Sequence, residues 1–357
     1  MTRRPVTSVD VARLAGVSQS AVSRAFSPEA SISPAMRARV LEAAATLNYR
    51  PSRIPAIMLS GRSLMIGVIV GGLSNPFYAS ALEQVAVSLQ ASGFQVLLVH
   101  VDDALTLDAA LNQLASYRVD AVITALAIGT RDTAEALSAL NIPAICFNSR
   151  FVGRNISTIT SNNRQSGAMA AKIMRECGVR FPVWLAGPAR NAASRERRHG
   201  FFDALTDHAL IDHALIDHAL TSDTPSPHPI LELQGNDTYE SGFNAMRDLL
   251  DRNFRPDGLF CSNDLMACGA MDALRDHGGL ACPKDVIVIG YDNIPQGAWH
   301  AYDLTTFDQR TEKLVDAAMD ILNDAFRPGA KALSRKIVVA AALVVRRSTA
   351  KAPPQVR

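Results

Sequence analysis

Four polar side chains near the N-terminus have the hydrogen-bonding groups that reading the edges of DNA bases requires. They are Gln19, Ser20, Ser23 and Arg24. A glutamine amide can bond adenine through two atoms, and an arginine guanidinium can bond guanine in the same way. Their spacing places them near the start of one short helix, whose first residues reach base edges when such a helix lies in the major groove. The pattern therefore predicts sequence-specific contact with DNA.

The distribution of charge along the chain favours a polyanionic partner for the same end. Residues 1–63 contain nine arginines, no lysine and three acidic residues, a net charge of +6. The whole chain carries +2, so the remaining residues carry 2 − 6 = −4. A basic segment of this kind is typical of nucleic-acid binding. A basic surface exposed to solvent would explain the charge equally well if charge were the only observation. The charge therefore supports DNA binding only in combination with the predicted helices.

Capping signals predict three short helices within residues 1–50. Thr7 and Asp10 form the pattern of a capping box, Gly16 suits the end of that first helix, and Ser18 suits the cap of the second. A third helix is expected to begin at Ser33-Pro34, because proline lacks only an N–H that the first turn leaves unpaired. The apolar residues expected to pack between the helices are Ala12, Ala15, Val22, Phe26, Met36, Val40, Ala44 and Leu47.

From residue 64 onward, apolar runs with strand character alternate with amphipathic segments. Fully apolar strands that alternate with helices are typical of parallel sheets covered by helices on both faces. The length of this region predicts two such α/β lobes, with the change from one to the other near residue 160. The expected strands are 64–70, 94–99, 121–126, 143–147, 183–186, 230–233, 258–261 and 286–291, and the expected helices include 79–91, 164–177, 239–252 and 264–277.

The sequence lacks the motifs of several enzyme classes. An enzyme that uses NAD would have the same alternation, but Gly67–Leu73, after the first expected strand, does not contain Gly-x-Gly-x-x-Gly. The phosphate-binding Gly-x-x-x-x-Gly-Lys loop, Gly-x-Ser-x-Gly and His-Glu-x-x-His are also absent. We therefore expect neither catalytic residues nor a cofactor.

The histidines and cysteines are not spaced along the sequence as the ligands of a metal site would be. Asp207–Ile211 is repeated as Asp212–Ile216 and, in part, as Asp217–Leu220. A step of five residues turns a helix by about 140°, so the three imidazoles would point in different directions. We therefore expect a surface insertion there and no bound metal. The five cysteines are odd in number and lack a Cys-x-x-Cys pair, which indicates reduced thiols.

The hydropathy of the chain predicts a cytoplasmic protein with no membrane partner. No apolar run approaches the ~20 residues that cross a bilayer. The basic residues at the N-terminus are not followed by an apolar segment, as they would be in a signal peptide.

Motifs that occur in order along the chain resemble those of the lactose-repressor (LacI/GalR) family of transcription regulators. The resemblance implies a repressor that binds a palindromic operator as a homodimer. It also implies a core like a periplasmic sugar-binding protein, with a small effector, such as a sugar or sugar derivative, between the lobes. The motifs are Asp10-Val11-Ala12, Ala15-Gly16-Val17-Ser18, Val22-Ser23-Arg24, Leu47-Asn48-Tyr49-Arg50-Pro51, Ser60–Ser63, Ile66–Val70, Asn75-Pro76-Phe77-Tyr78, Arg197-x-x-Gly200-Phe201, Ser262-Asn263-Asp264, Ile289–Asp292 and Leu304-Thr305-Thr306.

For the DNA-binding part, the resemblance implies both head contacts and a hinge helix that forms on DNA. Met58 occupies the position of a leucine that enters the minor groove, and an apolar wedge of this kind kinks DNA. Pro55 replaces a small residue and disfavours helical geometry at Ile54, so hinge folding is expected to be weaker than in relatives. The expected DNA contacts are Thr7, Ser18, Gln19, Ser20, Ser23, Arg24, Arg53 (to phosphate) and Met58.

For the core, the resemblance implies effector contacts that lie mostly just beyond strands, where open parallel sheets bind ligands. Aromatic, arginine, asparagine and aspartate side chains suit a ligand with many hydroxyl groups. A role as a strand-end cap or surface ion pair is the alternative for each residue taken singly. The expected effector contacts are Asn75, Phe77, Asn148, Arg150, Arg197, Asn263 and Asp292.

The expected organisation has four parts. A helix-turn-helix domain over residues 1–50 is followed by a hinge helix and linker over 51–63. A two-lobed domain for effector binding and dimerisation follows over 64–348, with a flexible tail over 349–357. A sugar-binding protein without a regulatory role is the alternative; it would share the lobes, and the DNA-binding head counts against it.

Overall fold

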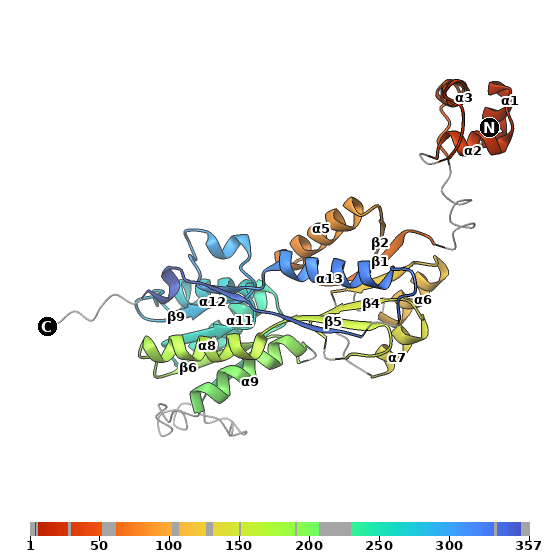
Figure 1. The fold of residues 1–357 in the computed structure, drawn as a ribbon. Helices are drawn as coiled ribbons and strands as arrows, with labels where there is room; N and C mark the ends of the chain where they lie inside the picture. Colours follow the sequence, from red (N-terminus) through yellow and green to blue (C-terminus); the bar gives the residue numbers. More distant parts are fainter. Residues whose placement is uncertain are drawn as a thin grey trace. The chain divides into compact units, whose positions relative to one another are not determined.

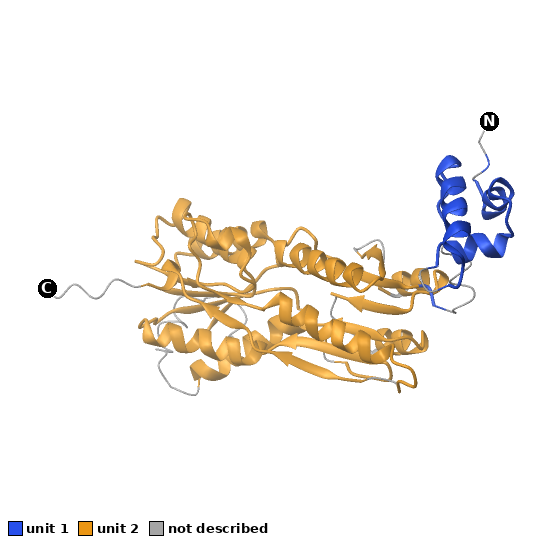
Figure 2. Ribbon diagram, turned by 45° about the horizontal axis from the view of Figure 1, so that its top comes forward, with its two compact units in different colours: residues 1–63 blue, residues 64–357 orange. Residues whose placement is uncertain are grey.

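The computed structural model describes residues 4, 6–27, 30–51, 62–101, 107–125, 131–149, 151–189, 191–206, 230–331 and 334–350 (Figure 1). Contacts divide the chain into two compact units, residues 1–63 and 64–357 (Figure 2). The expected hinge helix with Pro55 and Met58, the contact Arg53, the effector contact Arg150 and the histidine-containing repeat lie outside the described residues. They stay predictions.

The described residues of the first unit form three helices, as the capping signals predict: α1 (Ser8–Ala15), α2 (Gln19–Ala25) and α3 (Pro34–Thr46). At the start of α1, the Asp10 carboxylate accepts hydrogen bonds from the Thr7 N–H at 2.9 Å and from the Thr7 hydroxyl at 2.7 Å. Gly16 ends α1 with a φ of 64°, a conformation that glycine adopts without strain. The Ser18 hydroxyl accepts from the N–H of Ala21 at 3.2 Å and so caps α2.

The core of this unit is small and consists largely of alanine and valine. The prediction is confirmed for Ala12, Val22, Val40 and Ala44, which are buried together with Val11, Ala25 and Ala43. Ala15, Phe26 and Leu47 are partly buried against them. The prediction is wrong for Met36, which is 38% exposed.

The second unit contains two α/β lobes, as the alternation predicts. In the first lobe, six parallel strands lie in the order β11-β5-β4-β3-β1-β2. Alternate residues of β1 face opposite ways, so that Val68 packs with α5 and α13, whereas Ile69 packs with α6 and α7. The elements are β1 (Met65–Val70), α5 (Pro76–Ala91), β2 (Gln95–His100), α6 (Leu107–Ser116), β3 (Ala121–Thr124), α7 (Arg131–Ala139), β4 (Ala144–Phe147), β5 (Ile156–Ser161), α13 (Thr311–Ala325) and β11 (Lys336–Val339).

The second lobe is built on four parallel strands in the order β7-β6-β8-β9, with a separate antiparallel pair, β10 and β12. Helices α8 and α9 pack on one face of the sheet and α11 and α12 on the other. The elements are α8 (Asn163–Glu176), β6 (Pro182–Ala186), α9 (Ala192–Thr206), β7 (Leu231–Gln234), α11 (Tyr239–Asp251), β8 (Gly258–Cys261), α12 (Asp264–Asp276), β9 (Ile287–Ile289), η1 (Pro295–Ala298), β10 (Thr306–Asp308), β12 (Ala342–Val344) and η2 (Arg347–Thr349).

The chain passes between the lobes at three crossovers, which follow β5, β10 and β11. The first crossover confirms the predicted change near residue 160. The other two were not predicted: α13 returns to the first lobe and lies beside α5 (Figure 1), and β12 then pairs with β10 in the second. Strand β5 was missed because its two isoleucines, Ile156 and Ile159, are separated by two polar residues, which matches neither an apolar run nor strict alternation. Ser157, Thr158 and Ser161 are nevertheless buried, and the Thr158 hydroxyl donates to the carbonyl oxygen of Ser149 at 2.8 Å.

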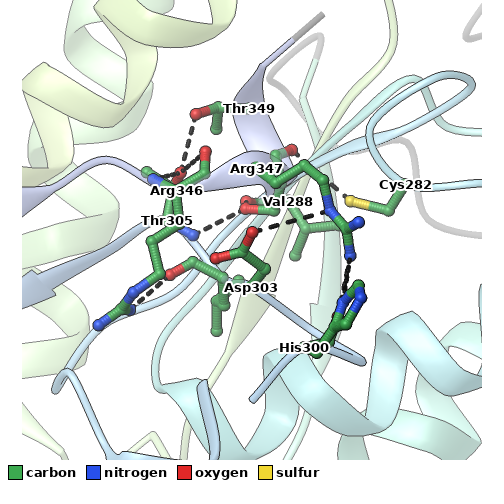
Figure 3. A network of polar contacts seen from close by, with 10 residues as sticks. Cys282, Val288, His300, Asp303, Thr305, Arg346, Arg347 and Thr349 are labelled. Atoms are coloured by element: carbon green, nitrogen blue, oxygen red, sulfur yellow. Dashed lines mark hydrogen bonds and ion pairs between the residues drawn. The ribbon is translucent and has the colours of Figure 1, made fainter. Parts of the chain in front are cut away.

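The last described residues are tied to the second lobe by a network of polar contacts (Figure 3). The Ser348 hydroxyl accepts from the N–H of Thr305 at 2.8 Å and donates to the carbonyl oxygen of Val288 at 2.6 Å. The Thr349 and Thr305 hydroxyls are 2.8 Å apart. Thr349, which the sequence assigns to the tail, thus belongs to this anchored turn; residues 351–357 lie outside the described residues.

Candidate functional site

Helix α2 presents a polar face on the surface of the first unit. Its residues Ala21, Val22 and Ala25 are buried in the small core. The predicted DNA contacts at its start and along its other side are all exposed: Ser18, Gln19, Ser20, Ser23 and Arg24. The structure therefore brings these residues together on one short helix, with the side chains of its first turn open to a partner.

Local hydrogen bonds orient several of these side chains. The Gln19 amide donates to the Ser8 hydroxyl at 2.9 Å, and the Ser18 and Ser20 hydroxyls are 2.9 Å apart. The Arg24 guanidinium donates from Nε to the carbonyl oxygen of Ser20 at 3.3 Å. Thr7 is half-buried, and its bonds to the Asp10 carboxylate are the main reason why the pKa of Asp10 is lowered. Thr7 and Ser18 therefore act as helix caps within this unit.

Arg37 has a structural role that the sequence did not suggest. Its guanidinium donates to the carbonyl oxygen of Ala25 at 2.7 Å and to those of Ser27 and Ala30 at 3.3 Å each. A cation at the end of a helix satisfies carbonyl groups that have no partner in the helix itself. Arg37 thus holds the end of α2 and the segment that leads to α3, and it differs in role from the exposed Arg24.

In the core, predicted effector contacts from both lobes meet directly. Asn75 caps α5: its Oδ1 accepts from the N–H of Phe77 at 3.0 Å. Its Nδ2 points across the lobes to Oδ2 of Asp292, at 3.5 Å, which is the outer limit of a hydrogen bond. The other oxygen of Asp292 accepts from Nε2 of Gln309 at 2.7 Å. All three side chains are buried.

Arg197 is buried in α9 and belongs to the same region. Its Nε donates to Oδ1 of Asn163 at 2.8 Å, and a second nitrogen donates to the carbonyl oxygen of Ser262. The guanidinium carbon lies 3.4 Å from the centre of the Tyr291 ring, a cation–π contact. Such a guanidinium is fixed in orientation before any ligand arrives.

Asn148 is connected to Arg197 through two polar residues at the first crossover. Asn163 donates to the Thr160 hydroxyl at 3.3 Å, and that hydroxyl donates to Oδ1 of Asn148 at 3.2 Å. Asn148 is half-buried and follows β4 with a φ of 54°. The structure thus joins Asn148, from the first lobe, to the arginine of the second lobe.

Asn263 acts as a cap at a strand end, which is the alternative to effector contact stated above for each of these residues. Its Oδ1 accepts from the N–H of Met266 at 2.9 Å and caps α12. Its Nδ2 donates to the carbonyl oxygen of Asp237 at 2.9 Å. Because both ends of the amide are bonded within the protein, Asn263 supports the walls of the site, and its contact with an effector stays a prediction.

Burial dominates the electrostatics of the cluster. It raises the pKa of Asp292 to about 7, against the opposite effect of the nearby Arg197, while Asp264 and Asp237 raise it further. Burial also raises the pKa of Tyr78, with Asp237 and Asp292 adding to the effect. Tyr78 of the first lobe therefore lies near two carboxylates of the second lobe.

Two hollows adjoin this cluster. The larger, of about 1150 Å³, is lined by Asn148, Ser161 and Asn163 together with residues of α8, α9 and β11. The smaller, of about 430 Å³, is lined by Phe77 and Asp292 together with residues of α5 and the start of α13. Ligand sites commonly have volumes of roughly 300–1,000 Å³. The contacts from Asp292 through Gln309 to Ser161 thus lead from a wall of the smaller hollow to a wall of the larger one.

Sequence reasoning missed several residues of the site. Tyr78 stands directly after two predicted contacts, and Gln309 directly follows β10, so the rule that ligands bind beyond strand ends could have found it. Ser161, at the end of β5, and Asn163, at the start of α8, gave no such signal, because β5 was not predicted. The residues missed are Tyr78, Ser161, Asn163, Asp237, Tyr291 and Gln309.

The described side chains of this site are carboxylates, amides, hydroxyls, aromatic rings and a guanidinium, which offer hydrogen bonds and packing surfaces. No set of three or more His, Cys, Asp or Glu side chains among them is placed to hold a metal ion. The thiols of Cys146 and Cys261 are buried, and burial raises the pKa of Cys146 to about 12, which opposes a nucleophilic thiolate. No helix in this part of the chain has the length and apolar character to cross a membrane. The arrangement is suited to holding a polar molecule.

Comparison with known proteins matches each unit to a family model. Residues 8–52 match "Bacterial regulatory proteins, lacI family", and residues 171–349, half of the chain, match "Periplasmic binding protein-like domain". The HTH-type transcriptional repressor PurR of Haemophilus influenzae (strain ATCC 51907 / DSM 11121 / KW20 / Rd) is 29% identical over 317 residues, 88% of this chain and 90% of its own. The ribose operon repressor of Escherichia coli (strain K12) is 28% identical over 318 residues, 88% of this chain and 92% of its own.

Solved structures of transcription regulators are similar to this chain over most of its length. The lac repressor dimer bound to operator and the anti-inducer ONPF has a TM-score of 0.81 at 27% identity, covering 97% of this chain and 99% of its own. A complex of the transcriptional regulator CelR with cellobiose has a TM-score of 0.67 at 29% identity, covering 97% of this chain and 100% of its own. The matched head counts against a sugar-binding protein without a regulatory role, and the protein is a transcription regulator and not an enzyme. The chain belongs to the lacI family of bacterial regulatory proteins.

Proposed function

We propose that this protein is a cytoplasmic repressor that binds a palindromic operator as a homodimer and responds to a sugar or sugar derivative between its lobes. The observation that carries the proposal is the exposed polar face of α2 on a three-helix unit, in the same chain as a buried polar cluster between two lobes. A solved relative is a repressor dimer on operator DNA, and another holds cellobiose. Five free thiols suit a reducing compartment.

For DNA, we assign base contacts to the exposed side chains of α2. Gln19, Ser20, Ser23 and Arg24 have the donors and acceptors that base edges require, and Thr7 and Ser18 lie at helix starts, where backbone N–H groups bind phosphate. Arg53 contributes a phosphate contact and Met58 the minor-groove wedge, both within the hinge. Two symmetric heads read two halves of a palindrome, so operator symmetry follows from dimer symmetry.

For the effector, we assign Asn75, Asn148, Arg197 and Asp292 as polar contacts, with Phe77 packing against the ligand. Arg150 completes the set, and Asn263 supports it from the end of β8. Carboxylate, amide and guanidinium groups each bond neighbouring hydroxyls, which suits a polyhydroxylated molecule. Because the contacts come from both lobes, an effector favours one arrangement of the lobes and so shifts the balance between states of different operator affinity.

The test of the DNA proposal is selection of binding sites by the purified full-length protein from a randomised DNA library. Enrichment of a palindrome bound by two chains is expected, with affinity well above that for a half-site or a scrambled sequence at one salt concentration. Equal affinity for all three DNAs would contradict it. The effector proposal is tested by thermal shift with sugars, sugar acids and sugar phosphates, because a ligand specific to the folded state raises the melting temperature.

A further inference from the structure

Gln309 connects the effector cluster to the crossovers. It lies directly after β10, at the second crossover, and its side chain is 2% exposed. Its Nε2 donates to Asp292 at 2.7 Å, and its Oε1 accepts from the Ser161 hydroxyl, at the first crossover, at 2.9 Å. The next residue, Asn162, accepts from the N–H of Ala341 at 2.8 Å, at the third crossover. One run of contacts therefore joins Asp292 to all three segments that connect the lobes.

The direction of these hydrogen bonds is fixed. An ionised carboxylate can only accept, so the amide nitrogen of Gln309 must face Asp292 and its oxygen must face Ser161. Asn75 is oriented in the same way, because its oxygen is occupied by the N–H of Phe77. Both amides therefore offer donors to Asp292. Protonation would turn one of the two oxygens of Asp292 into a hydroxyl, which accepts a hydrogen bond more weakly than a carboxylate oxygen does, so the arrangement favours the ionised form.

The groups around Asp292 have opposing effects on its ionisation, so that the ionised and protonated forms are close in free energy near neutral pH. Burial and the carboxylates of Asp264 and Asp237 oppose ionisation, whereas Arg197 and Gln309 favour it. The resulting pKa of about 7 means that loss of a single hydrogen bond changes the fraction of ionised Asp292 at neutral pH. The bond from Gln309 is the shorter of the two amide bonds.

We infer that Gln309 is a positioning residue of the effector site: it holds Asp292 ionised and links it through Ser161 to the crossovers, so that events at Asp292 reach the segments that set the lobe arrangement. For an effector, the inference rests on the proposed function. The proton is itself a ligand of Asp292, so the link can be measured without effector or DNA. A negative result in the operator or sugar experiments therefore leaves this test intact.

The first experiment measures unfolding of the full-length protein in urea between pH 5 and 9. In the wild type, stability should fall as the pH rises toward the folded pKa of Asp292, about 7, and should level off above it. In Gln309→Leu the upper end of this fall should move to higher pH by about one unit, a tenfold change in proton affinity. The move should vanish when Asp292→Asn is added, because no titrating group remains. Gln296→Leu is the matched control: its side-chain oxygen is buried without a hydrogen-bond partner among the described residues. It should leave the profile in place.

A profile unchanged in Gln309→Leu, or a move that persists beside Asp292→Asn, would overturn the inference. If Gln309→Leu does not fold, Ser161→Ala gives the same readout. That change removes one hydroxyl and frees the Gln309 amide to rotate, so a smaller move in the same direction is expected. An unchanged profile there would then overturn the assignment.

The second experiment measures hydrogen–deuterium exchange at pH 6 and pH 8, corrected for the intrinsic effect of pH. In the wild type, exchange around residues 158–164 should differ between the two values, since protonation at Asp292 changes the bonds at the first crossover. In Ser161→Ala this difference should fall at least threefold, although stability still falls with rising pH, with the small move described above. A difference of equal size in wild type and Ser161→Ala would show that Gln309 does not pass the change to the crossover.

Discussion

At the scale of single residues, Arg24 and Arg37 of the first unit carry the same charge but have different roles. Arg24 is exposed on α2, whereas Arg37 binds three carbonyl oxygens beyond the end of that helix. Arg24→Ala should weaken operator binding by about 1–3 kcal/mol and binding to random DNA by less, since specificity resides in base contacts. Binding to both DNAs is measured at one salt concentration. Arg37→Met, the matched control, should lower the melting temperature without changing the ratio of the two affinities. Equal losses on both DNAs for Arg24→Ala would refute its base contact.

A second residue-scale prediction concerns the anchored C-terminal turn in Figure 3. Ser348 is 1% exposed and bonds both the N–H of Thr305 and the carbonyl oxygen of Val288. Ser348→Ala leaves both groups buried without this partner, which should cost about 1–3 kcal/mol of the free energy of unfolding. Thr349→Val is the control: the Thr305 hydroxyl keeps its bonds to the backbone of Arg346, so the loss should be smaller. Urea unfolding measures both, and equal losses would argue against the buried pair.

At the scale of elements, helices α8 and α9 approach so closely that glycine is required. A Cβ atom on Gly200 would overlap the carbonyl oxygen of Arg164, and one on Gly167 would overlap that of Arg197. Alanine normally favours a helix over glycine by roughly 0.5–1 kcal/mol. Gly200→Ala should nevertheless destabilise the protein by several kcal/mol, because backbone must move, and it should disturb Arg197 on the same helix. His199→Ala, an exposed neighbour, should be nearly neutral in thermal unfolding. A melting temperature of Gly200→Ala equal to the wild type would contradict the tight packing.

The helices and strands differ in how far the sequence alone predicts them. The caps Thr7, Ser18 and Ser33 were predictable because a helix start depends on one side chain and the next turn. Apart from β11, which was not predicted, the apolar strands of both sheets were predictable for the same local reason. Strand β5 was not, because its buried serine and threonine side chains are satisfied by partners that only the fold supplies. Likewise Asn263 resembled a ligand contact, and only the structure shows its amide bonded to Met266 and Asp237.

At the scale of the whole molecule, two buried carboxylates of the second lobe link stability to pH. Burial raises the pKa of Asp264 to about 6 and that of Asp292 to about 7, against about 3.9 in an unfolded chain. A folded pKa above the unfolded value means that stability is fully present below the unfolded pKa and is lost as the pH rises through the folded one. The free energy of unfolding should therefore fall between about pH 4 and pH 7, by on the order of 3–4 kcal/mol per group. Asp10 and Asp276, whose pKa values are lowered, titrate below this window. Urea unfolding across the window measures the fall, which should shrink in Asp292→Asn.

Coupling between effector and operator also belongs to the whole molecule, because the two sites lie in different units of the chain. Asp292 faces Asn75 across the lobes, so a ligand bonded to it changes what holds the lobes together. Asp292→Asn keeps the shape of the side chain and removes its charge. Operator affinity without effector should stay close to the wild type, whereas the change caused by a saturating sugar from the thermal-shift screen should fall at least tenfold. The measurement is operator affinity by fluorescence anisotropy with and without that sugar. Asp120→Asn, a change to a carboxylate of the first lobe that accepts from the N–H of Leu64, is the matched control and should respond normally. A normal response of Asp292→Asn would remove this carboxylate from the effector site, and loss of operator binding without sugar would show that it maintains the DNA-binding arrangement itself.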